Sequence, residues 1–220
     1  MIVTEGITKL YKSGEREFAA LRDVSIRIER GEFVAITGAS GSGKTTLMNI
    51  LGCLDRASSG SYFLDGENVA DLSGKRRTRL RNEKIAFIFQ SFNLLNGLNA
   101  LENAALPLIY RGLSRSRAHE RAEAALDMVG LTMRALHKPN QLSGGQQQRV
   151  AIARAIASDT PVILADEPCG SLDSRSGSRI MELLKSENEK GKTIILITHD
   201  LKAAGKADRL ITVRDGRVFT

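Results

Sequence analysis

The chain has 220 residues, which suits a single compact domain with its own core, and 42% of them are apolar, which excludes a disordered protein. No apolar run approaches the roughly 18–20 residues of a membrane-spanning helix, and two cysteines are too few for a disulfide scaffold. The 32 lysines and arginines outnumber the 25 aspartates and glutamates. The resulting charge of +7 raises the question of an anionic partner, such as nucleic acid, a membrane surface or phosphate.

The N-terminal part of the chain, residues 1–38, is predicted to be rich in strands. Val24, Ile26 and Ile28 alternate with polar residues, which is the pattern of a half-buried strand. Residues 33–37 form a continuous apolar run, as expected of a strand that is covered on both faces. We predict next a loop at 38–43, a helix at 44–53, a strand at 60–64, a basic helix at 73–84 and a further strand at 85–89.

The middle of the chain is predicted to be helical, and strands return after it. Apolar residues spaced by three and four predict helices at 101–109, 114–128 and 144–157. Strands are predicted at 162–165, 193–198 and 209–213, a helix at 174–189, and a closing hairpin strand at 217–219. Strands and helices that alternate on both sides of a helical insert favour an α/β fold with a parallel sheet.

A glycine-rich loop follows the apolar strand at 33–37 and precedes a predicted helix. It matches the pattern G-x-x-x-x-G-K-[ST] with residues Gly38, Ala39, Ser40, Gly41, Ser42, Gly43, Lys44 and Thr45. The glycines let backbone N–H groups approach a phosphate chain, and the helix N-terminus adds the positive end of its dipole. Lys44 is predicted to reach the β- and γ-phosphates, Thr45 to bind Mg²⁺, and Thr46 to contact the α-phosphate. The loop therefore predicts a nucleotide site and leaves the reaction open.

Two carboxylates end the apolar strand that starts at Val162. Because ligands meet a buried parallel sheet at the carboxyl ends of its strands, Asp166 and Glu167 are expected at the ligand edge. Asp166 is predicted to hold Mg²⁺ and Glu167 to polarise the attacking water as general base, since a metal-bound carboxylate is a poor base. The alternatives are a charged turn after a strand, or a nucleotide-binding switch in which Glu167 is a surface carboxylate.

A second phosphate-binding element opens the helix predicted at 144–157. It is the pentapeptide Leu142-Ser143-Gly144-Gly145-Gln146, in which a serine and two glycines precede a helix N-terminus. Only the first of the two elements carries a lysine. A twofold dimer satisfies both elements if each nucleotide lies between the loop of one copy and the Ser-Gly-Gly turn of the other. A plain helix cap is the alternative.

With the phosphate loop, the LSGGQ pentapeptide and the Asp-Glu strand in this order, the sequence resembles the ATP-binding-cassette (ABC) ATPases over its whole length. The finer resemblance, to the MacB/LolD type of macrolide-efflux and lipoprotein-release ATPases, lies in the stretches 38–55, 87–95, 140–157 and 163–177. It implies a P-loop NTPase fold of the α/β class, with a mainly parallel core sheet, an N-terminal antiparallel β subdomain and an α-helical insert. The chain is then one ABC ATPase domain, 1–220, with its core at 1–90 and 159–220 and a helical sub-lobe at about 91–158.

The resemblance also implies roles for single residues. Gln90 looks like the glutamine that contacts Mg²⁺ and the water, and His199 like the switch histidine that contacts the γ-phosphate. Asp173 would couple the two sites of the dimer, and Tyr11 would stack on adenine. On the residues alone, a surface or helix-capping histidine and a core tyrosine are the alternatives. The nucleotide of the other copy would be bound by Ser143, Gly144, Gly145 and Gln146.

The implied activity is ATP hydrolysis with Mg²⁺, in a homodimer that drives a separate integral-membrane permease and has no nucleic-acid partner. This places the protein peripherally on the cytoplasmic side of the inner (plasma) membrane, in an exporter or an envelope mechanotransmission system. The apolar segment 91–110 lies near the permease or belongs to the core of the sub-lobe. The alternative function is a soluble ABC ATPase acting on DNA or ribosomes. Such proteins usually carry a long coiled coil or two cassettes, and the sequence shows neither sustained heptads nor a second cassette.

The positive charge is concentrated in two segments. Residues 75–84 hold six lysines and arginines and one glutamate, and residues 111–121 hold four arginines and one glutamate. Neither segment has the interleaved aromatic residues of a base-stacking surface, which argues against nucleic acid. Solvated helix faces, or attraction to anionic lipid or to an acidic permease loop, are the alternatives.

Cys169, where the subgroup usually has threonine, is a small-residue replacement or a redox-sensitive thiol.

Overall fold

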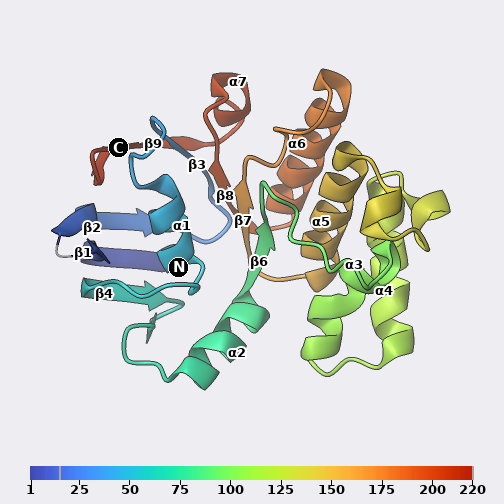
Figure 1. Cartoon of the computed structure of the whole chain (residues 1–220), viewed down its shortest axis with the longest axis horizontal. Coiled ribbons are helices and arrows are strands. Elements are labelled where there is room, and N and C mark those ends of the chain that lie inside the picture. The colour runs from blue at the N-terminus through green and yellow to red at the C-terminus, as the bar shows by residue number, and fades with distance from the viewer. Residues whose placement is uncertain (15, 220) are drawn as a thin grey trace. The chain divides into compact units, whose positions relative to one another are not determined.

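The computed structural model describes residues 1–14 and 16–219, and the backbone forms two compact units (Figure 1). The first unit contains Met1–Arg81 and Asn188–Thr220, and the second contains Asn82–Glu187. The predicted boundaries of a helical sub-lobe, about 91–158, stay a prediction. Among the described residues, none of the helices combines the length and the hydropathy that crossing a membrane requires.

The N-terminal part of the first unit is an antiparallel sheet. Its strands lie in the order β2-β1-β4-β5, where β1 is Ile2–Ser13, β2 is Arg16–Ile28, β4 is Ser59–Leu64 and β5 is Glu67–Asn68. Ile2 pairs with Ile28 on one side and with Leu64 on the other, and all three side chains are buried. The alternation predicted at Val24, Ile26 and Ile28 is confirmed, since these side chains are buried while the residues between them are exposed. The antiparallel subdomain that the resemblance implied is therefore present.

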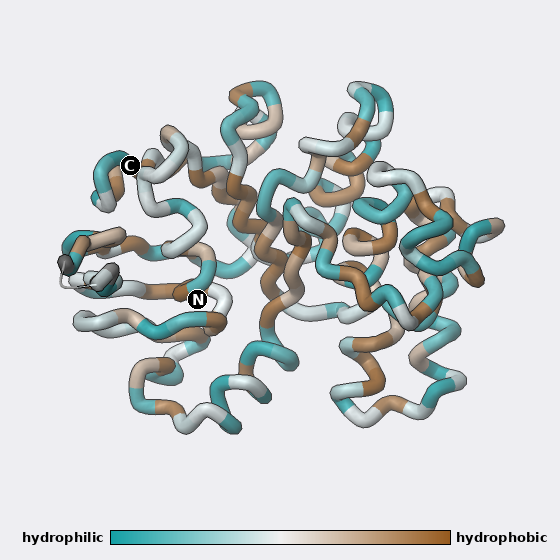
Figure 2. Tube along the Cα trace, viewed as in Figure 1, coloured by the Kyte–Doolittle hydropathy of each residue, from teal (hydrophilic) through white to brown (hydrophobic). Residues whose placement is uncertain are grey.

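A second group of strands in the first unit carries the buried apolar runs. It has the order β10-β9-β3-β8, where β3 is Phe33–Thr37, β8 is Thr193–Ile197, β9 is Arg209–Arg214 and β10 is Arg217–Phe219. Strand β3 is parallel to both β8 and β9, and β10 forms an antiparallel hairpin with β9. Every residue of β3 is buried, as predicted for a strand covered on both faces, and every residue of β8 is buried as well; Figure 2 shows the apolar residues along both strands. Helices α1 (Lys44–Leu51) and α7 (Leu201–Ala204) follow β3 and β8.

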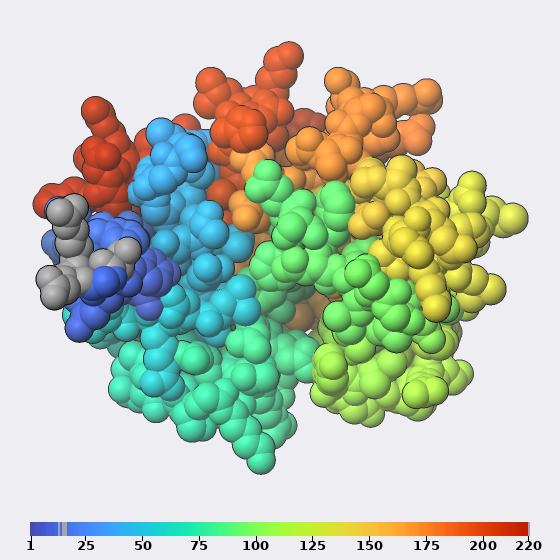
Figure 3. Space-filling view, in the orientation of Figure 1, coloured from blue at the N-terminus to red at the C-terminus, as the bar shows by residue number. Residues whose placement is uncertain are grey.

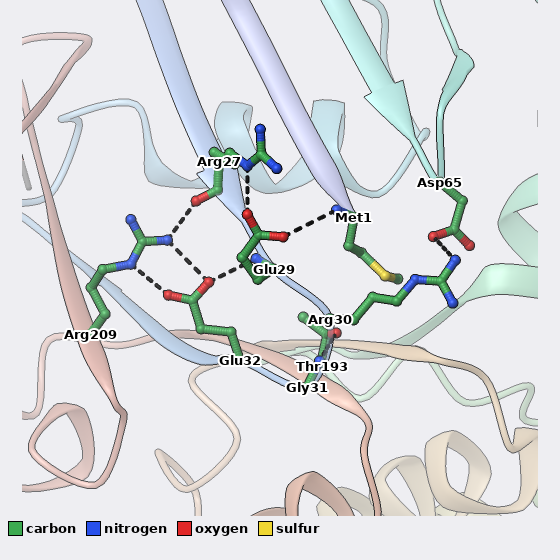
Figure 4. Close-up of polar contacts among 9 residues, drawn as sticks. All are labelled: Met1, Arg27, Glu29, Arg30, Gly31, Glu32, Asp65, Thr193 and Arg209. Carbon is green, nitrogen blue, oxygen red and sulfur yellow. Dashed lines mark hydrogen bonds and ion pairs between the residues drawn. The ribbon is translucent and has the colours of Figure 1, made fainter.

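Charged side chains fix the turn between β2 and β3 (Figure 4). Arg209 donates hydrogen bonds from Nε and Nη2 to the Glu32 carboxylate at 2.6 and 3.2 Å, and Nη2 also donates to the carbonyl of Arg27 at 2.6 Å. The Glu29 carboxylate pairs with Arg27, while the Glu29 amide donates to Glu32 at 2.8 Å. These charge-assisted bonds tie the antiparallel sheet to β9 and thereby fix where β3 begins.

Helix α2 (Gly74–Lys84) carries the larger share of the excess positive charge. Leu80 is its buried residue, and Lys75, Arg76 and Arg79 are exposed; Figure 3 shows the segment at the surface of this view. Arg76 donates two hydrogen bonds to the Glu67 carboxylate at 3.0 and 3.1 Å, and Arg81 donates to the carbonyl of Cys53 at 3.0 Å. The basic helix predicted at 73–84 is therefore present within one residue of its predicted start.

The second unit combines a strand pair with a set of helices. Strands β6 (Ile85–Ile88) and β7 (Val162–Asp166) are parallel. The helices are α3 (Ala100–Tyr110), α4 (Arg115–Met128), α5 (Gly144–Ser158) and α6 (Ser174–Glu189), with short 3-10 turns η1 (Thr132–Arg134) and η2 (Pro139–Gln141). Helices α3, α4 and α5 contact one another, and small side chains such as Ala104, Ala122 and Ala153 are fully buried among them. The four predicted helices are confirmed to within one residue at each end.

Candidate functional site

The glycine-rich loop leaves the carboxyl end of β3 and enters α1, as predicted. Gly38 has φ 150°, and a Cβ built there would lie 2.2 Å from the carbonyl oxygen of Val213. Gly43 has φ 109°, and its Cβ would lie 2.6 Å from the carbonyl oxygen of Ala20. Both positions therefore require glycine, for space and for backbone conformation. The loop is held against neighbouring backbone at its two ends.

The side chains of this loop offer donors to an anion. Lys44 donates to the carbonyl oxygens of Gly38 and Ala39 at 2.8 and 2.7 Å, so its ammonium lies within the turn of the loop. Ser42 is buried, and its Oγ has no hydrogen-bond partner among the described residues. A buried hydroxyl without a partner is costly unless a ligand completes it. Thr45, on the first turn of α1, is exposed.

His199 lies at the same sheet edge as the loop. Ile197 of β8 pairs with Ile36 of β3, and the Thr198 amide donates to the Ile36 carbonyl at 3.2 Å. Because the two strands are parallel, their carboxyl ends bring His199 and Gly38 to one edge of the unit. The His199 side chain is exposed, and Asp200 caps α7 by accepting a hydrogen bond from the Lys202 amide at 2.8 Å.

Tyr11 is joined to helix α1. Its hydroxyl donates to Asp55 Oδ2 at 3.0 Å and also shares a hydrogen bond with the Thr46 side chain. Burial and the bond to Asp55 raise the pKa of Tyr11. Thr46, predicted to contact the α-phosphate, is thus bonded to the residue predicted to stack on adenine. The first unit therefore brings together Tyr11, the phosphate loop and His199.

The second unit brings Gln90 and the acidic pair to one edge. Ile88 of β6 pairs with Ala165 of β7 in parallel, so Gln90 and Asp166 both follow the carboxyl ends of neighbouring strands. Glu167 has φ 45°, a left-handed conformation that is uncommon for a residue with a side chain. Its carbonyl accepts a hydrogen bond from the Gly170 amide at 3.1 Å. Such backbone strain at a strand end is typical of functional sites.

The signature pentapeptide lies beside two other predicted segments of this unit. Ser143 caps α5, because its Oγ accepts from the Gln146 amide at 3.3 Å while the Gln146 side chain accepts from the Ser143 amide at 2.9 Å. A Cβ added to Gly145 would lie 3.3 Å from Leu172 Cδ2, and one added to Gly144 would lie 3.9 Å from the Phe92 ring. The signature glycines therefore pack against the segment before Asp173 and the segment after Gln90.

Asp173 directly precedes helix α6. Its Oδ1 accepts a hydrogen bond from the Ser176 amide at 3.0 Å, and hydrogen bonds from Ser176 lower the pKa of Asp173. The carboxylate is exposed and charged at neutral pH. A helix cap is therefore one established task of this side chain, and its predicted role in a dimer stays a prediction.

Arg154 is a site residue that sequence reasoning missed. It donates from Nη1 to the carbonyl of Asn93 at 2.6 Å and from Nη2 to the carbonyl of Phe92 at 2.8 Å. These two residues follow Gln90 closely and have left-handed φ values of 49° and 61°. Burial lowers the pKa of Arg154 to about 10. The available signal was its position four residues after Val150, on the apolar face of α5, where an arginine needs a specific reason.

Comparisons with known proteins decide the family. A family model described as "ABC transporter" matches residues 21–170, more than half of the chain. The chain belongs to the ABC transporter family. The macrolide export ATP-binding/permease protein MacB 2 of Aeromonas hydrophila subsp. hydrophila is 52% identical over 218 residues, which are 99% of this chain and 34% of that protein. MacB of Hyphomonas neptunium is 51% identical over 220 residues, or 100% of this chain and 34% of that protein.

Solved structures agree with the family. The dimeric structure of MJ0796, a bacterial ABC transporter cassette, has a TM-score of 0.96 at 49% identity and covers 100% of this chain and 97% of that one. A post-hydrolysis state of the ATP-binding cassette MJ0796 bound to ADP and Pi has the same TM-score at 48% identity and the same coverage. The predicted family and fold are confirmed. The chain spans about a third of the length of the curated relatives it matches.

Proposed function

We propose that this chain binds Mg²⁺·ATP, hydrolyses it as a homodimer and thereby drives a membrane permease. The observation that carries the proposal is the phosphate loop. Its terminal glycines are fixed against backbone, Lys44 lies inside its turn, and α1 starts where the loop ends. The cassette of similar fold that binds ADP and phosphate supports the same ligand class here.

The first unit would hold the nucleotide. Lys44 exchanges two neutral carbonyl acceptors for phosphate oxygens, and hydrogen bonds between two charged groups are the stronger kind. The N-terminus of α1 and the buried Ser42 hydroxyl add donors on the same loop. His199, at the edge shared with the loop, contacts the γ-phosphate, and Tyr11 supplies a ring for the base.

The oxygen donors assigned to Mg²⁺ fit this ion. They are the Thr45 hydroxyl, the Gln90 amide oxygen and the Asp166 carboxylate, all hard ligands of the kind Mg²⁺ takes beside substrate phosphates. The described residues contain no group of three or more His, Cys, Asp or Glu side chains that would hold a metal alone. Oxygens of the nucleotide phosphates would complete the coordination. When bound, the ion supplies charge neutralisation at the β- and γ-phosphates.

Glu167 would act as the general base. Its carboxylate accepts a proton from the attacking water while the water oxygen bonds to the γ-phosphorus and the bond to the β–γ bridging oxygen breaks. ADP and phosphate are the products. Lys44 and His199 stabilise the charge on the transferred group. The backbone turns to a left-handed conformation at Glu167, directly after the last residue of β7, Asp166.

The signature would serve the nucleotide of a second copy. Helix α5 starts at Gly144, so the amides of Gly144 and Gly145 have no partner within the helix. The Ser143 hydroxyl accepts from Gln146 and keeps its own proton for donation. These donors suit a γ-phosphate held by another subunit, with Asp173 coupling the two sites. The dimeric cassette among the similar structures supports this arrangement.

The membrane partner follows from the relatives' names. They are named as ATP-binding/permease proteins of macrolide export, and this chain covers 34% of the length of each. We extend to this chain a permease of that type and a peripheral place on the cytoplasmic side of the inner membrane. Outward transport or mechanical work on envelope substrates is the corresponding task.

The experiment measures ATP hydrolysis with possible partners and with matched variants. We expect activity that a co-purified membrane protein raises and that DNA or ribosomes do not. Lys44→Ala should abolish ATP binding, whereas Lys202→Ala, which removes an exposed lysine of α7, should not. Stimulation by DNA or ribosomes would instead indicate a soluble ABC ATPase, and unchanged ATP binding in Lys44→Ala would contradict the assigned site.

A further inference from the structure

Tyr11 is held by a polar cluster whose central acceptor, Asp55, has no role in the site described above. We name it the Asp55 clamp, and it consists of Asp55, Lys9, Tyr11 and Thr46. The Tyr11 hydroxyl donates to Asp55 Oδ2 at 3.0 Å, and Lys9 Nζ donates to Asp55 Oδ1 at 2.8 Å. Asp55 thus uses both oxygens on strand β1, and Lys9 adds a bond to the Arg56 carbonyl at 2.7 Å.

The clamp connects Tyr11 to both sides of helix α1. Thr46, on the first turn of α1, shares a hydrogen bond with the Tyr11 hydroxyl. Asp55 comes four residues after α1 ends, and its amide donates back to the Asn49 carbonyl at 3.1 Å. The phosphate-binding end of α1 and the Tyr11 ring are therefore fixed in one frame by side-chain bonds within the first unit.

One face of the Tyr11 ring is covered by a lysine side chain. Lys9 Nζ lies 4.9 Å from the ring centroid, over the ring, so a base can stack only on the face that the cation does not cover. Phe18, the cross-strand partner of Tyr11, has its ring centroid 5.7 Å away and is 54% exposed. Burial alone would raise the pKa of Asp55, but bonds from Lys9, the Arg56 amide and Tyr11 lower it. Asp55 is thus a charged acceptor at neutral pH.

We infer that Asp55 is a positioning residue for the nucleotide base: it fixes the Tyr11 ring at the distance from the phosphate loop that one bound nucleotide spans. The inference rests on the proposed function, in which Tyr11 stacks on the base. Asp55 touches no part of the nucleotide and acts through the Tyr11 hydroxyl. Its loss should therefore weaken binding of a complete nucleotide and leave binding of a bare phosphate chain unchanged.

The test compares two probes, Mg²⁺·ATP and magnesium tripolyphosphate, by equilibrium titration of the full chain. Tyr11→Phe keeps the ring and removes the anchor, and Asp55→Ala removes its acceptor. We expect each to weaken ATP binding about fivefold, the worth of one hydrogen bond, with the affinity for tripolyphosphate unchanged. The double variant should weaken ATP binding by less than the two single effects combined, since both changes break the bond between Tyr11 and Asp55.

Two further variants distinguish an error in the role of Asp55 from an error in the role of Tyr11. Asp65→Asn removes a comparable ion pair, to Arg30 at 2.8 Å, and should change neither affinity. Tyr11→Ala should weaken ATP binding at least about tenfold, as expected for a lost stacked base. If Tyr11→Ala does so while Tyr11→Phe and Asp55→Ala bind ATP normally, the clamp is wrong and the base platform stands. If Tyr11→Ala binds ATP normally, Tyr11 does not stack on the base, and the role inferred for Asp55 is wrong as well.

Discussion

Arg154 provides a sharp test of how the segment after Gln90 is held. Replacing it with methionine keeps the length of the side chain and removes two charge-assisted bonds, at 2.6 and 2.8 Å, which stabilise by about 1.5–3 kcal/mol each. The same change lets Phe92 and Asn93 leave their left-handed conformations, which cost about 1–2 kcal/mol each. The two effects largely offset each other, so the free energy of unfolding should fall by only about 1–2 kcal/mol.

The consequence for function should be larger than the consequence for stability. Arg154→Met should increase amide hydrogen exchange in residues 91–95 and lower kcat, because Gln90 precedes the released segment. ATP affinity should change little, since Lys44 and its loop are untouched. Arg149→Met is the matched control on the same helix, where Arg149 donates to the Val129 carbonyl at 3.1 Å. Unchanged exchange in Arg154→Met, or equal exchange and kcat changes in both variants, would refute the reasoning.

Three further predictions concern single side chains. Gly38→Ala should destabilise the protein by at least about 2 kcal/mol in urea and abolish ATP binding, whereas Gly74→Ala, where an added Cβ meets nothing within 4 Å, should do neither. A thiol reagent at pH 7.5 should label Cys169 in the native protein and spare Cys53, which is buried with its pKa raised to about 11; labelling of both would contradict this. Because the folded pKa of Asp55 is lowered, its stabilising effect is present above the ordinary pKa of about 4 and is lost on acidification, so the stability gap between wild type and Asp55→Asn should shrink toward pH 2.

The sequence predicts the larger elements because their periodicity is long enough to read. Residues 33–37 and 144–157 match β3 and α5 within one residue, since a buried run and an apolar helical face leave few alternatives. The short elements β5 and α7, of two and four residues, are absent from the prediction because they are too short for a strand or helix pattern of apolar residues to repeat. The helix predicted at 44–53 ends at Leu51, where the chain turns through Gly52 and the left-handed Cys53.

In the candidate site, too, some residues are predictable from the sequence and others are not. Lys44 and its loop are predictable, because the motif states the backbone geometry that its glycines permit. Arg154 and Asp55 are not, because each acts on a segment far away in the sequence: 61 residues from Asn93 and 44 residues from Tyr11. Such contacts depend on the tertiary fold, and a single sequence carries no direct signal of them.

Glu167→Gln is the most direct test of the central claim, that this chain is an ATPase with Glu167 as its general base. The substitution keeps the size of the side chain and removes its ability to accept a proton. We expect ATP affinity to be retained, turnover to fall by at least about 10²-fold, and a dimer to accumulate on size exclusion when Mg²⁺·ATP is present. Hydrolysis at the wild-type rate by Glu167→Gln would contradict the account.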